Sequence, residues 1–149
     1  MKRVHAILLV EDNAADIKIT QRALRESAVP VELLVVRDGQ EALDYLLREG
    51  KFAAEAGHGW RCPDLILLDL NLPRLTGREV LERIRATPNL RTVPVVVLTT
   101  SHREEDVQEM YDAGANTYIE KPQDFARFVQ VLQTIQRYWL DTALLPPVP

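Results

Sequence analysis

Short apolar runs and amphipathic segments alternate five times along this chain of 149 residues. Most of the apolar runs show no polar alternation, which indicates strands that are buried on both faces. Strands that alternate with helices predict an α/β domain of (βα)5 type, with a doubly wound, five-stranded parallel sheet. The predicted strands are residues 4–10, 31–36, 64–70, 93–100 and 115–120, and the predicted helices are residues 14–27, 39–50, 77–87, 104–114 and 124–140.

The composition is that of an ordinary globular protein, with 46% apolar and 27% charged residues. We expect one domain over residues 1–141, a loop insert at 50–62 and an apolar tail at 142–149. The net charge of −4 favours neither a nucleic-acid partner nor an anionic membrane, and no segment has the length of a membrane span. One cysteine, Cys62, and the lack of a secretory leader pattern predict a cytoplasmic protein.

Polar side chains follow four of the predicted strands at the point where each strand ends. Ligands of open α/β sheets bind at the carboxyl ends of the strands, so we expect these side chains to lie at one site. They are Glu11 and Asp12 after the first strand, Asp69 and Asn71 at the third, Thr99, Thr100 and Ser101 at the fourth, and Glu120, Lys121 and Pro122 at the fifth.

Three carboxylates at one edge repel one another unless a cation neutralises them. Mg²⁺ prefers oxygen ligands of this kind and often shares them with phosphate oxygens. The hydroxyl of Thr99 and the ammonium of Lys121 are then available to a phosphoryl group. Asp69, in the middle, is the expected nucleophile, because carboxylates form aspartyl-phosphates. A solvated loop residue is the better interpretation of each residue alone, but not of the whole set.

Four motifs in combination resemble the receiver domain of two-component response regulators, over about residues 4–140. They are LLVEDN (8–13), LLDLNLP followed by Thr76 and Gly77 (67–77), VVLTTS (96–101) and YIEKP (118–122). The resemblance implies the flavodoxin-like receiver fold, and a regulatory phosphoacceptor that catalyses only its own phosphorylation and dephosphorylation.

The resemblance implies that Asp69 is phosphorylated and that Mg²⁺ is the cofactor. Asp12 and Asp69 would bind the metal directly with the backbone carbonyl of Asn71, and Glu11 would bind through a water. Many members have aspartate where this chain has Glu11, so we expect a shifted metal geometry and not a lost site. Asn71 would also help to control dephosphorylation.

The resemblance assigns roles to further residues. Thr99 and Lys121 would contact the phosphoryl group, and Thr99 and Tyr118 would form the conformational switch. Ser101 would control access of the attacking water. The peptide bond before Pro122 would be cis, which is uncommon enough to be a structural feature.

The expected function is that of a single-domain response regulator that takes a phosphoryl group from a sensor histidine kinase. It would signal through protein contact or act as a phosphate sink. The insert at 50–62 and the length of the chain resemble the stand-alone regulators that partner phytochrome kinases.

Two alternatives use related chemistry or topology. A haloacid-dehalogenase-like phosphatase needs a second acid where this chain has Asn71, and its motif follows the first strand. A flavodoxin-like flavin carrier needs a phosphate-binding loop after the first strand, whereas EDNAAD (11–16) is acidic.

The last helix and the tail predict a homodimer. Val131 and Tyr138 widen the apolar stripe of the helix, which runs on to Trp139. Leu144 and Leu145 of the tail have no predicted sheet left to cover, so we expect them to dock on a second copy with two-fold symmetry. A disordered tail is the alternative.

Overall fold

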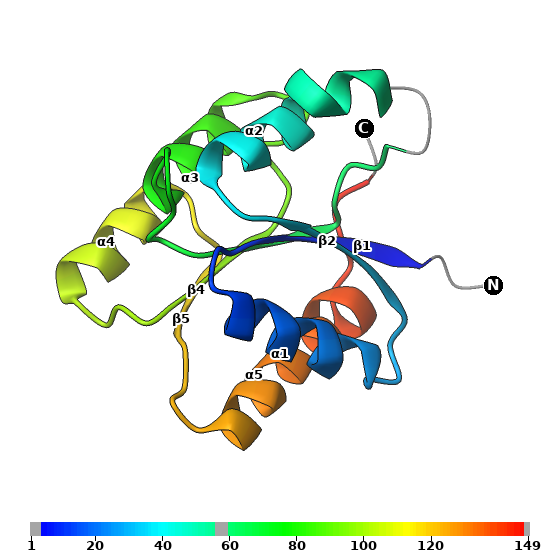
Figure 1. The fold of residues 1–149 in the computed structure, drawn as a ribbon, viewed down its shortest axis with the longest axis vertical. Coiled ribbons are helices and arrows are strands. Elements are labelled where there is room, and N and C mark those ends of the chain that lie inside the picture. Colours follow the sequence, from blue (N-terminus) through cyan, green and yellow to red (C-terminus); the bar gives the residue numbers. More distant parts are fainter. Residues whose placement is uncertain (1–3, 56–59, 148–149) are drawn as a thin grey trace.

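A five-stranded parallel sheet forms the centre of the computed structural model, which describes residues 4–55 and 60–147 (Figure 1). The strand order is β2-β1-β3-β4-β5, so the order reverses beside β1. The predicted doubly wound (βα)5 sheet is confirmed. The strands are β1 (His5–Val10), β2 (Val31–Val36), β3 (Leu65–Leu68), β4 (Val95–Thr99) and β5 (Thr117–Glu120).

Helices cover both faces of the sheet (Figure 1). Two helices pack together on one face and three on the other. The first pair is α1 (Ala14–Arg25) and α5 (Phe125–Arg137), and the other three are α2 (Gly39–Leu47), α3 (Gly77–Ala86) and α4 (Glu104–Asp112). Among the described residues, no helix has both the length and the apolar character needed to cross a membrane.

Most helices begin at a side chain that accepts a hydrogen bond from the first turn. Asn13, Asp38 and Asp124 fill this position at α1, α2 and α5. At α3, Thr76 and Glu79 form a reciprocal capping box. These local signals place each helix start directly after the strand end or loop that precedes it, where the site residues also lie.

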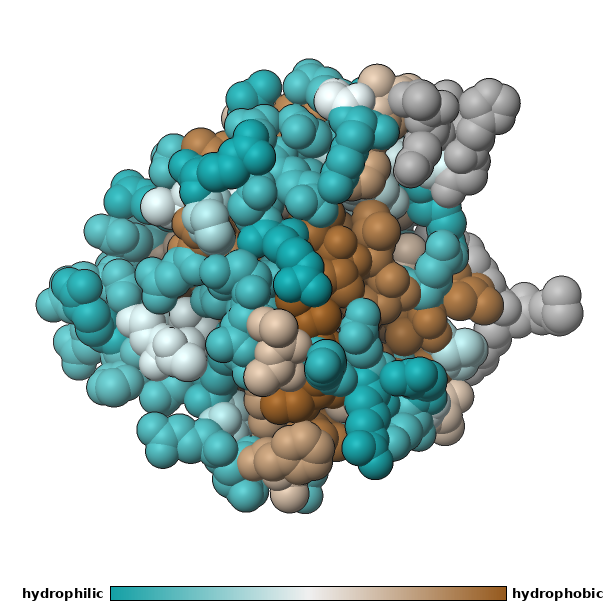
Figure 2. Space-filling view, viewed as in Figure 1, coloured by the Kyte–Doolittle hydropathy of each residue, from teal (hydrophilic) through white to brown (hydrophobic). Residues whose placement is uncertain are grey.

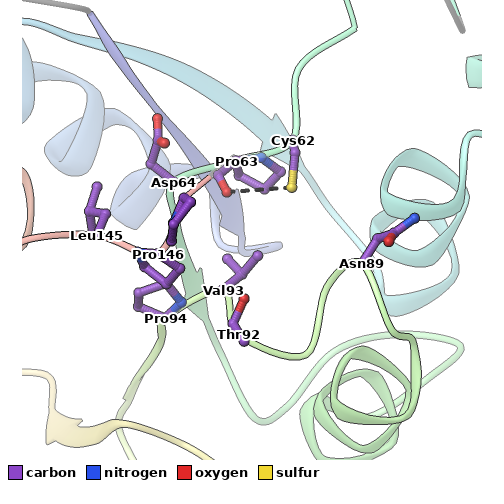
Figure 3. A pocket seen from close by; sticks show the side chains of 10 residues that line it. Cys62, Pro63, Asp64, Asn89, Thr92, Val93, Pro94, Leu145 and Pro146 are labelled. Carbon is purple, nitrogen blue, oxygen red and sulfur yellow. Dashed lines mark hydrogen bonds between the residues drawn. The ribbon is translucent and has the colours of Figure 1, made fainter. Parts of the chain in front are cut away.

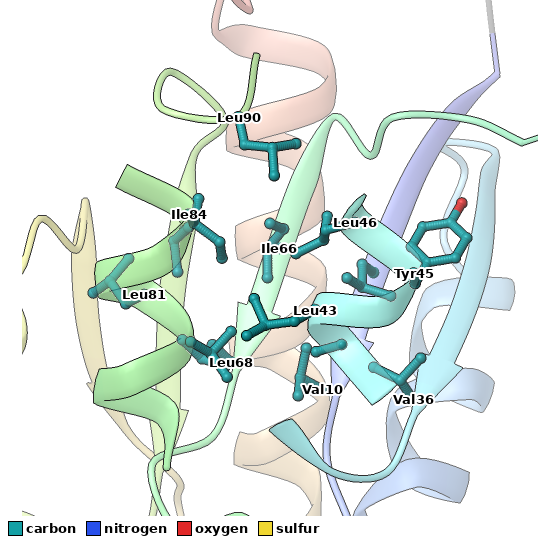
Figure 4. Close-up of a cluster of buried hydrophobic side chains, with 14 of the residues drawn as sticks. Val10, Val36, Leu43, Tyr45, Leu46, Ile66, Leu68, Leu81, Ile84 and Leu90 are labelled. Atoms are coloured by element: carbon teal, nitrogen blue, oxygen red, sulfur yellow. The ribbon is translucent and has the colours of Figure 1, made fainter. Parts of the chain in front are cut away.

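The sheet divides the apolar core into two layers. Val10, Ile66 and Leu68 point toward α2 and α3 (Figure 4), whereas alternate residues such as Leu9 and Leu67 pack against α1 and α5. Both sets are almost completely buried. Strands covered on both faces explain the unbroken apolar runs in the sequence.

The sheet is less well covered at its β2 edge. Figure 2 shows an apolar band between α1 and α2, where β2 runs. Val31, Leu33 and Val35 of β2 are only half-buried.

Part of the insert at 50–62 packs as an aromatic cluster against α2. Residues Gly50–Glu55 form a short 3-10 helix, η1, and residues 56–59 lie outside the described residues. The ring of Tyr45 lies 5.1 Å from that of Phe52 and 5.6 Å from that of Trp60. The insert is therefore anchored by its two ends to the α2 side of the molecule.

Only part of the apolar surface of the last helix covers the sheet. Phe128, Leu132 and Ile135 are buried, but Phe125 is 55% exposed. Phe125 is the first residue of α5 and lines a surface groove between α1 and α5, with Ile19 among its neighbours. Phe125 is therefore not among the residues of α5 that cover the sheet.

The tail folds back over the amino ends of the strands. After a π-helical turn, η2 (Tyr138–Thr142), the chain runs along the end of the sheet opposite to the predicted site (Figure 1). Leu145, Pro146 and Pro147 line a small cavity with Pro63 and Pro94, which precede β3 and β4 (Figure 3). Part of the tail therefore packs against the sheet of its own chain.

Candidate functional site

The carboxyl ends of β1, β3, β4 and β5 bring together most of the polar residues singled out in the sequence. Carboxylate oxygens of Glu11, Asp12 and Asp69 all lie within 4.8 Å of one another. We call these three residues the acid cluster. Asp12 is exposed, whereas Glu11 and Asp69 are buried. The cluster therefore has one side open to solvent and one side against the core.

Asp69 is held by the backbone around it. Its N–H donates to the carbonyl of Val10 on β1, at 3.1 Å, and its Oδ1 accepts from the N–H of Leu70, at 2.7 Å. The start of α3 presses against the same turn: a Cβ at Gly77 would lie 2.3 Å from the carbonyl oxygen of Asp69. A residue larger than glycine at position 77 would therefore displace the Asp69 backbone.

Lys121 brings a positively charged ammonium group to the site. Its side chain is only 5% exposed, and its Nζ lies 2.5 Å from Glu11 Oε2, 2.9 Å from Asp16 Oδ2 and 3.4 Å from Asp69 Oδ2. Burial alone lowers the pKa of an ammonium, but the hydrogen bonds to Glu11 and Asp16 and the charge of Asp69 outweigh it, so the pKa of Lys121 is raised. Lys121 is therefore fully charged at neutral pH.

Glu11 is the acid whose ionisation is most strongly opposed. Burial, and to a lesser extent the charge of Asp69, raise the pKa of Glu11 to about 7, although the hydrogen bond from Lys121 lowers it in part. The charge of Lys121 is shared among three acids, including Asp16, and does not fully offset the burial of Glu11. An added cation at the acid cluster would favour the ionised form of Glu11.

The acid cluster fits a hard divalent cation. It offers three carboxylates on one open edge, with no sulfur or nitrogen ligand among them, and oxygen ligands with room for water suit Mg²⁺ and similar ions. Asn71 is exposed two positions after Asp69, where its backbone carbonyl follows the same turn.

Thr99 stands at the end of β4 with its hydroxyl buried. Within the described part of the chain, its Oγ1 has no hydrogen-bond partner, and the residue is 0% exposed. An unpaired buried hydroxyl costs free energy, about 1–3 kcal/mol. Such a group is poised to bind an acceptor that enters the site.

Ser101 and Tyr118 connect β4, β5 and the start of α4. The Tyr118 hydroxyl donates to the Ser101 carbonyl at 2.9 Å, and the Ser101 hydroxyl donates to Asp106 of α4 at 2.6 Å. Burial, in the main, raises the pKa of Tyr118. The Ser101 side chain is therefore engaged with α4 and not free beside the acid cluster.

Two contacts of the site are absent from the sequence-based expectations. Asp16, on the first turn of α1, binds Lys121. Tyr111, near the end of α4, accepts a hydrogen bond from the backbone N–H of Tyr118 at 3.1 Å. Asp16 belongs to the same acidic segment, EDNAAD (11–16), as Glu11 and Asp12, which is a weak signal for the first contact. No local pattern indicates the second.

One expectation about the site is wrong. The peptide bond between Lys121 and Pro122 is trans. The trans form is favoured by about 0.5–1 kcal/mol before proline. The N–H of Lys121 already donates to the carbonyl of Thr99, at 2.7 Å, with the bond in this form.

The fold, together with the polar residues at the carboxyl ends of the strands, is that of a regulatory signalling domain. A family model described as the response regulator receiver domain matches residues 7–133. The chain therefore belongs to the response regulator receiver domain family. This is a regulatory family, which favours the receiver interpretation over the phosphatase and the flavin carrier.

Similar proteins narrow the class further. The chain is 43% identical over 140 residues to the response regulator Rcp1 of Synechocystis sp., a match that covers 94% of this chain and 92% of that protein. The solved structure of the phosphorylated cyanobacterial phytochrome response regulator RcpA is 48% identical, with a TM-score of 0.90, and the match covers 97% of this chain and 100% of that one. The Mn²⁺-bound form of Rcp1 is 42% identical, with a TM-score of 0.88, over 96% and 99% of the two chains. The predicted resemblance to stand-alone phytochrome-associated response regulators is confirmed.

Proposed function

We propose that this chain receives a phosphoryl group on Asp69 from a sensor histidine kinase of the phytochrome type. The observation that carries the proposal is the position of Asp69, which is buried at a strand end between two further acids and the ammonium of Lys121. The relatives RcpA and Rcp1 support the choice of kinase, because RcpA is described as a phytochrome response regulator. A cytoplasmic location, expected from the sequence, is part of this proposal.

The reaction is a transfer between two nucleophiles. A carboxylate oxygen of Asp69 forms a bond to phosphorus as the phosphorus–nitrogen bond of the kinase phosphohistidine breaks. The electron pair of that bond goes to the imidazole nitrogen, which takes up a proton when it becomes neutral histidine. Lys121 lies where its ammonium can bind a phosphoryl oxygen, and the unpaired hydroxyl of Thr99 supplies a second donor.

Mg²⁺ is the proposed cofactor. Asp12 and Asp69 would hold it directly with the backbone carbonyl of Asn71, and Glu11 would bind through a water. When bound, the ion supplies positive charge that offsets both the clustered carboxylates and the incoming phosphoryl oxygens. The Mn²⁺-bound form of the relative Rcp1 supports a divalent cation as the ligand of this chain.

Thr99 and Tyr118 form the proposed switch. The Tyr118 hydroxyl donates to the Ser101 carbonyl, and no described residue pairs with the Thr99 hydroxyl. Binding of Thr99 to a phosphoryl oxygen would draw the end of β4 toward Asp69 and change the space open to the Tyr118 ring. The readout would be altered contact with another protein, or removal of phosphoryl groups from the kinase.

We assign control of dephosphorylation to Asn71 and Ser101. Asn71 is exposed next to the site, and an amide cannot act as a base toward water. Ser101 is small and half-buried. A bulky change such as Ser101→Arg should alter the decay rate of the phosphorylated chain.

We also propose a two-fold homodimer through the last helix and tail. Tyr138 is 52% exposed and Leu144 is 101% exposed, and Val131 and Trp139 are half-buried beside them. These apolar side chains support a contact with a second copy. Leu145 packs against its own chain, so it should contribute less to the dimer contact than Leu144 does.

The test is phosphoryl transfer to the wild type and to Asp69→Asn, with a labelled histidine kinase or acetyl phosphate as donor. The wild type should take up one alkali-labile phosphoryl group with Mg²⁺ and none in EDTA. Asp69→Asn keeps the shape of the side chain but loses the nucleophile, so it should take up none. Labelling of Asp69→Asn at the wild-type rate would refute the assignment, and continuous release of phosphate would favour a phosphatase.

A further inference from the structure

We propose that Asp16 is a positioning residue that holds the Lys121 ammonium when a divalent cation binds the acid cluster. The inference rests on the proposed metal site and concerns a residue outside it. It assigns a role to the fourth carboxylate of the site, which lies on α1 and not at a strand end.

The partners of Lys121 divide into two kinds. Glu11 and Asp69 belong to the acid cluster, so their oxygens are the ones that a cation needs. Asp16 Oδ2 lies 2.9 Å from Lys121 Nζ but is not part of that cluster. Asp16 is therefore the acceptor that can stay bound to Lys121 when Glu11 and Asp69 bind a metal ion.

The backbone of Asp16 is held without help from Lys121. Its N–H donates to the side chain of Asn13 at 2.9 Å, and its carbonyl accepts from the Thr20 hydroxyl at 2.8 Å. The first turn of α1 also attracts the negative charge of its carboxylate, because the amino end of a helix carries partial positive charge. The backbone that carries the Asp16 carboxylate is therefore held by contacts that involve neither Lys121 nor the acid cluster.

Lys121 needs such an acceptor because it cannot reach water easily. Its side chain is 5% exposed, and a buried charge without a partner is strongly unfavourable. Without Asp16, the ammonium would stay on Glu11 and Asp69 and compete with the cation for the same oxygens. Asp16 therefore lowers the cost of metal binding, and leaves the ammonium close enough to Asp69 to meet a phosphoryl group.

The experiment measures Mg²⁺ binding to the unphosphorylated chain, from amide chemical shifts at the ends of β1 and β3. Asp16→Asn should raise the half-saturating Mg²⁺ concentration about tenfold, the size typical of coupled neighbours. Glu26→Gln, on the exposed end of the same helix, removes the same charge far from Lys121 and should change it less than twofold, about the size of a surface substitution.

The same substitution made in a variant without Lys121 shows whether Asp16 acts through Lys121 or attracts the metal ion by its own charge. In Lys121→Met, no ammonium competes for the cluster, so adding Asp16→Asn should change Mg²⁺ binding by less than about twofold. Lys121→Gln gives a second neutral background if Lys121→Met does not fold. Asp16→Glu, which keeps a carboxylate, should restore part of the affinity lost in Asp16→Asn.

Two results would overturn the inference. One is an equal loss of affinity with and without Lys121, which would show that Asp16 acts only through its charge on the metal. The other is unchanged Mg²⁺ binding in Asp16→Asn. Both are measured without a phosphoryl donor, so failure of Asp69 to accept a phosphoryl group would refute the proposed function and leave this test intact.

Discussion

Replacing Lys121 by methionine should destabilise the metal-free chain, and Mg²⁺ should restore much of the loss. The methionine fills similar space but leaves Glu11, Asp16 and Asp69 without their ammonium. Removing one partner of a buried ion pair costs about 3–5 kcal/mol. At about 1–3 kcal/mol per molar urea, the unfolding midpoint should fall by about 1–5 M.

The loss should depend on pH through Glu11. Burial raises its pKa from 4.5 to about 7 in the wild type, so its stability contribution is full below 4.5 and is lost as pH rises through about 7. At about 1.4 kcal/mol per pH unit, this group alone makes the wild type about 3 kcal/mol less stable at pH 8 than at pH 4.5. Without Lys121 the pKa of Glu11 should rise further. The loss of stability of Lys121→Met relative to the wild type should therefore be larger at pH 8 than at pH 6.

The assay is urea unfolding followed by circular dichroism, at pH 6 and pH 8, in EDTA and in excess Mg²⁺. Arg22→Met, on the exposed face of α1, is the control for loss of a positive charge. A loss below about 1 kcal/mol at pH 8 in EDTA, the size expected for an exposed ion pair, would refute the reasoning. So would an equal loss at the two pH values, or no recovery in Mg²⁺.

Three further predictions concern the switch and the tail. Thr99→Val replaces a buried hydroxyl that has no described partner, so it should stabilise the unphosphorylated chain by about 1 kcal/mol in urea unfolding. It should also abolish any phosphorylation-dependent change in partner affinity. A destabilised variant would contradict the first expectation. Tyr111→Phe removes the acceptor of the Tyr118 N–H, so hydrogen exchange at that amide should be several-fold faster, with little change at Thr117 as the control. Removal of residues 142–149 should shift sedimentation from dimer to monomer at micromolar concentration; a monomeric full-length chain would refute the dimer.

The sequence alone determined the architecture, because the signals for it are local. The unbroken apolar runs and the side-chain caps are read within a few residues of each other. The predicted strand 31–36 matches β2, and predicted helix starts at 14, 39, 77 and 104 match α1, α2, α3 and α4. The predicted strands at 64–70 and 93–100 are too long: β3 ends at Leu68, before the turn that holds Asp69, and β4 begins only after Pro94.

The sequence also indicated which side chains meet at one edge of the sheet. The carboxyl ends of parallel strands lie on one side by topology, so Glu11, Asp12, Asp69, Thr99 and Lys121 could be grouped without knowledge of any distance.

Only the tertiary structure decided how these groups pair. Lys121 and Asp16 are separated by 105 positions, and no periodic pattern links a lysine after the last strand to one particular acid on the first helix. The same holds for Tyr111 with Tyr118, which depends on how α4 lies against β5. It holds for Leu145 too, because whether a tail covers its own sheet or another copy depends on where the strands begin in space. Local spacing fixes what a segment can form, but the packing of distant segments fixes which charges and apolar groups are left to find partners.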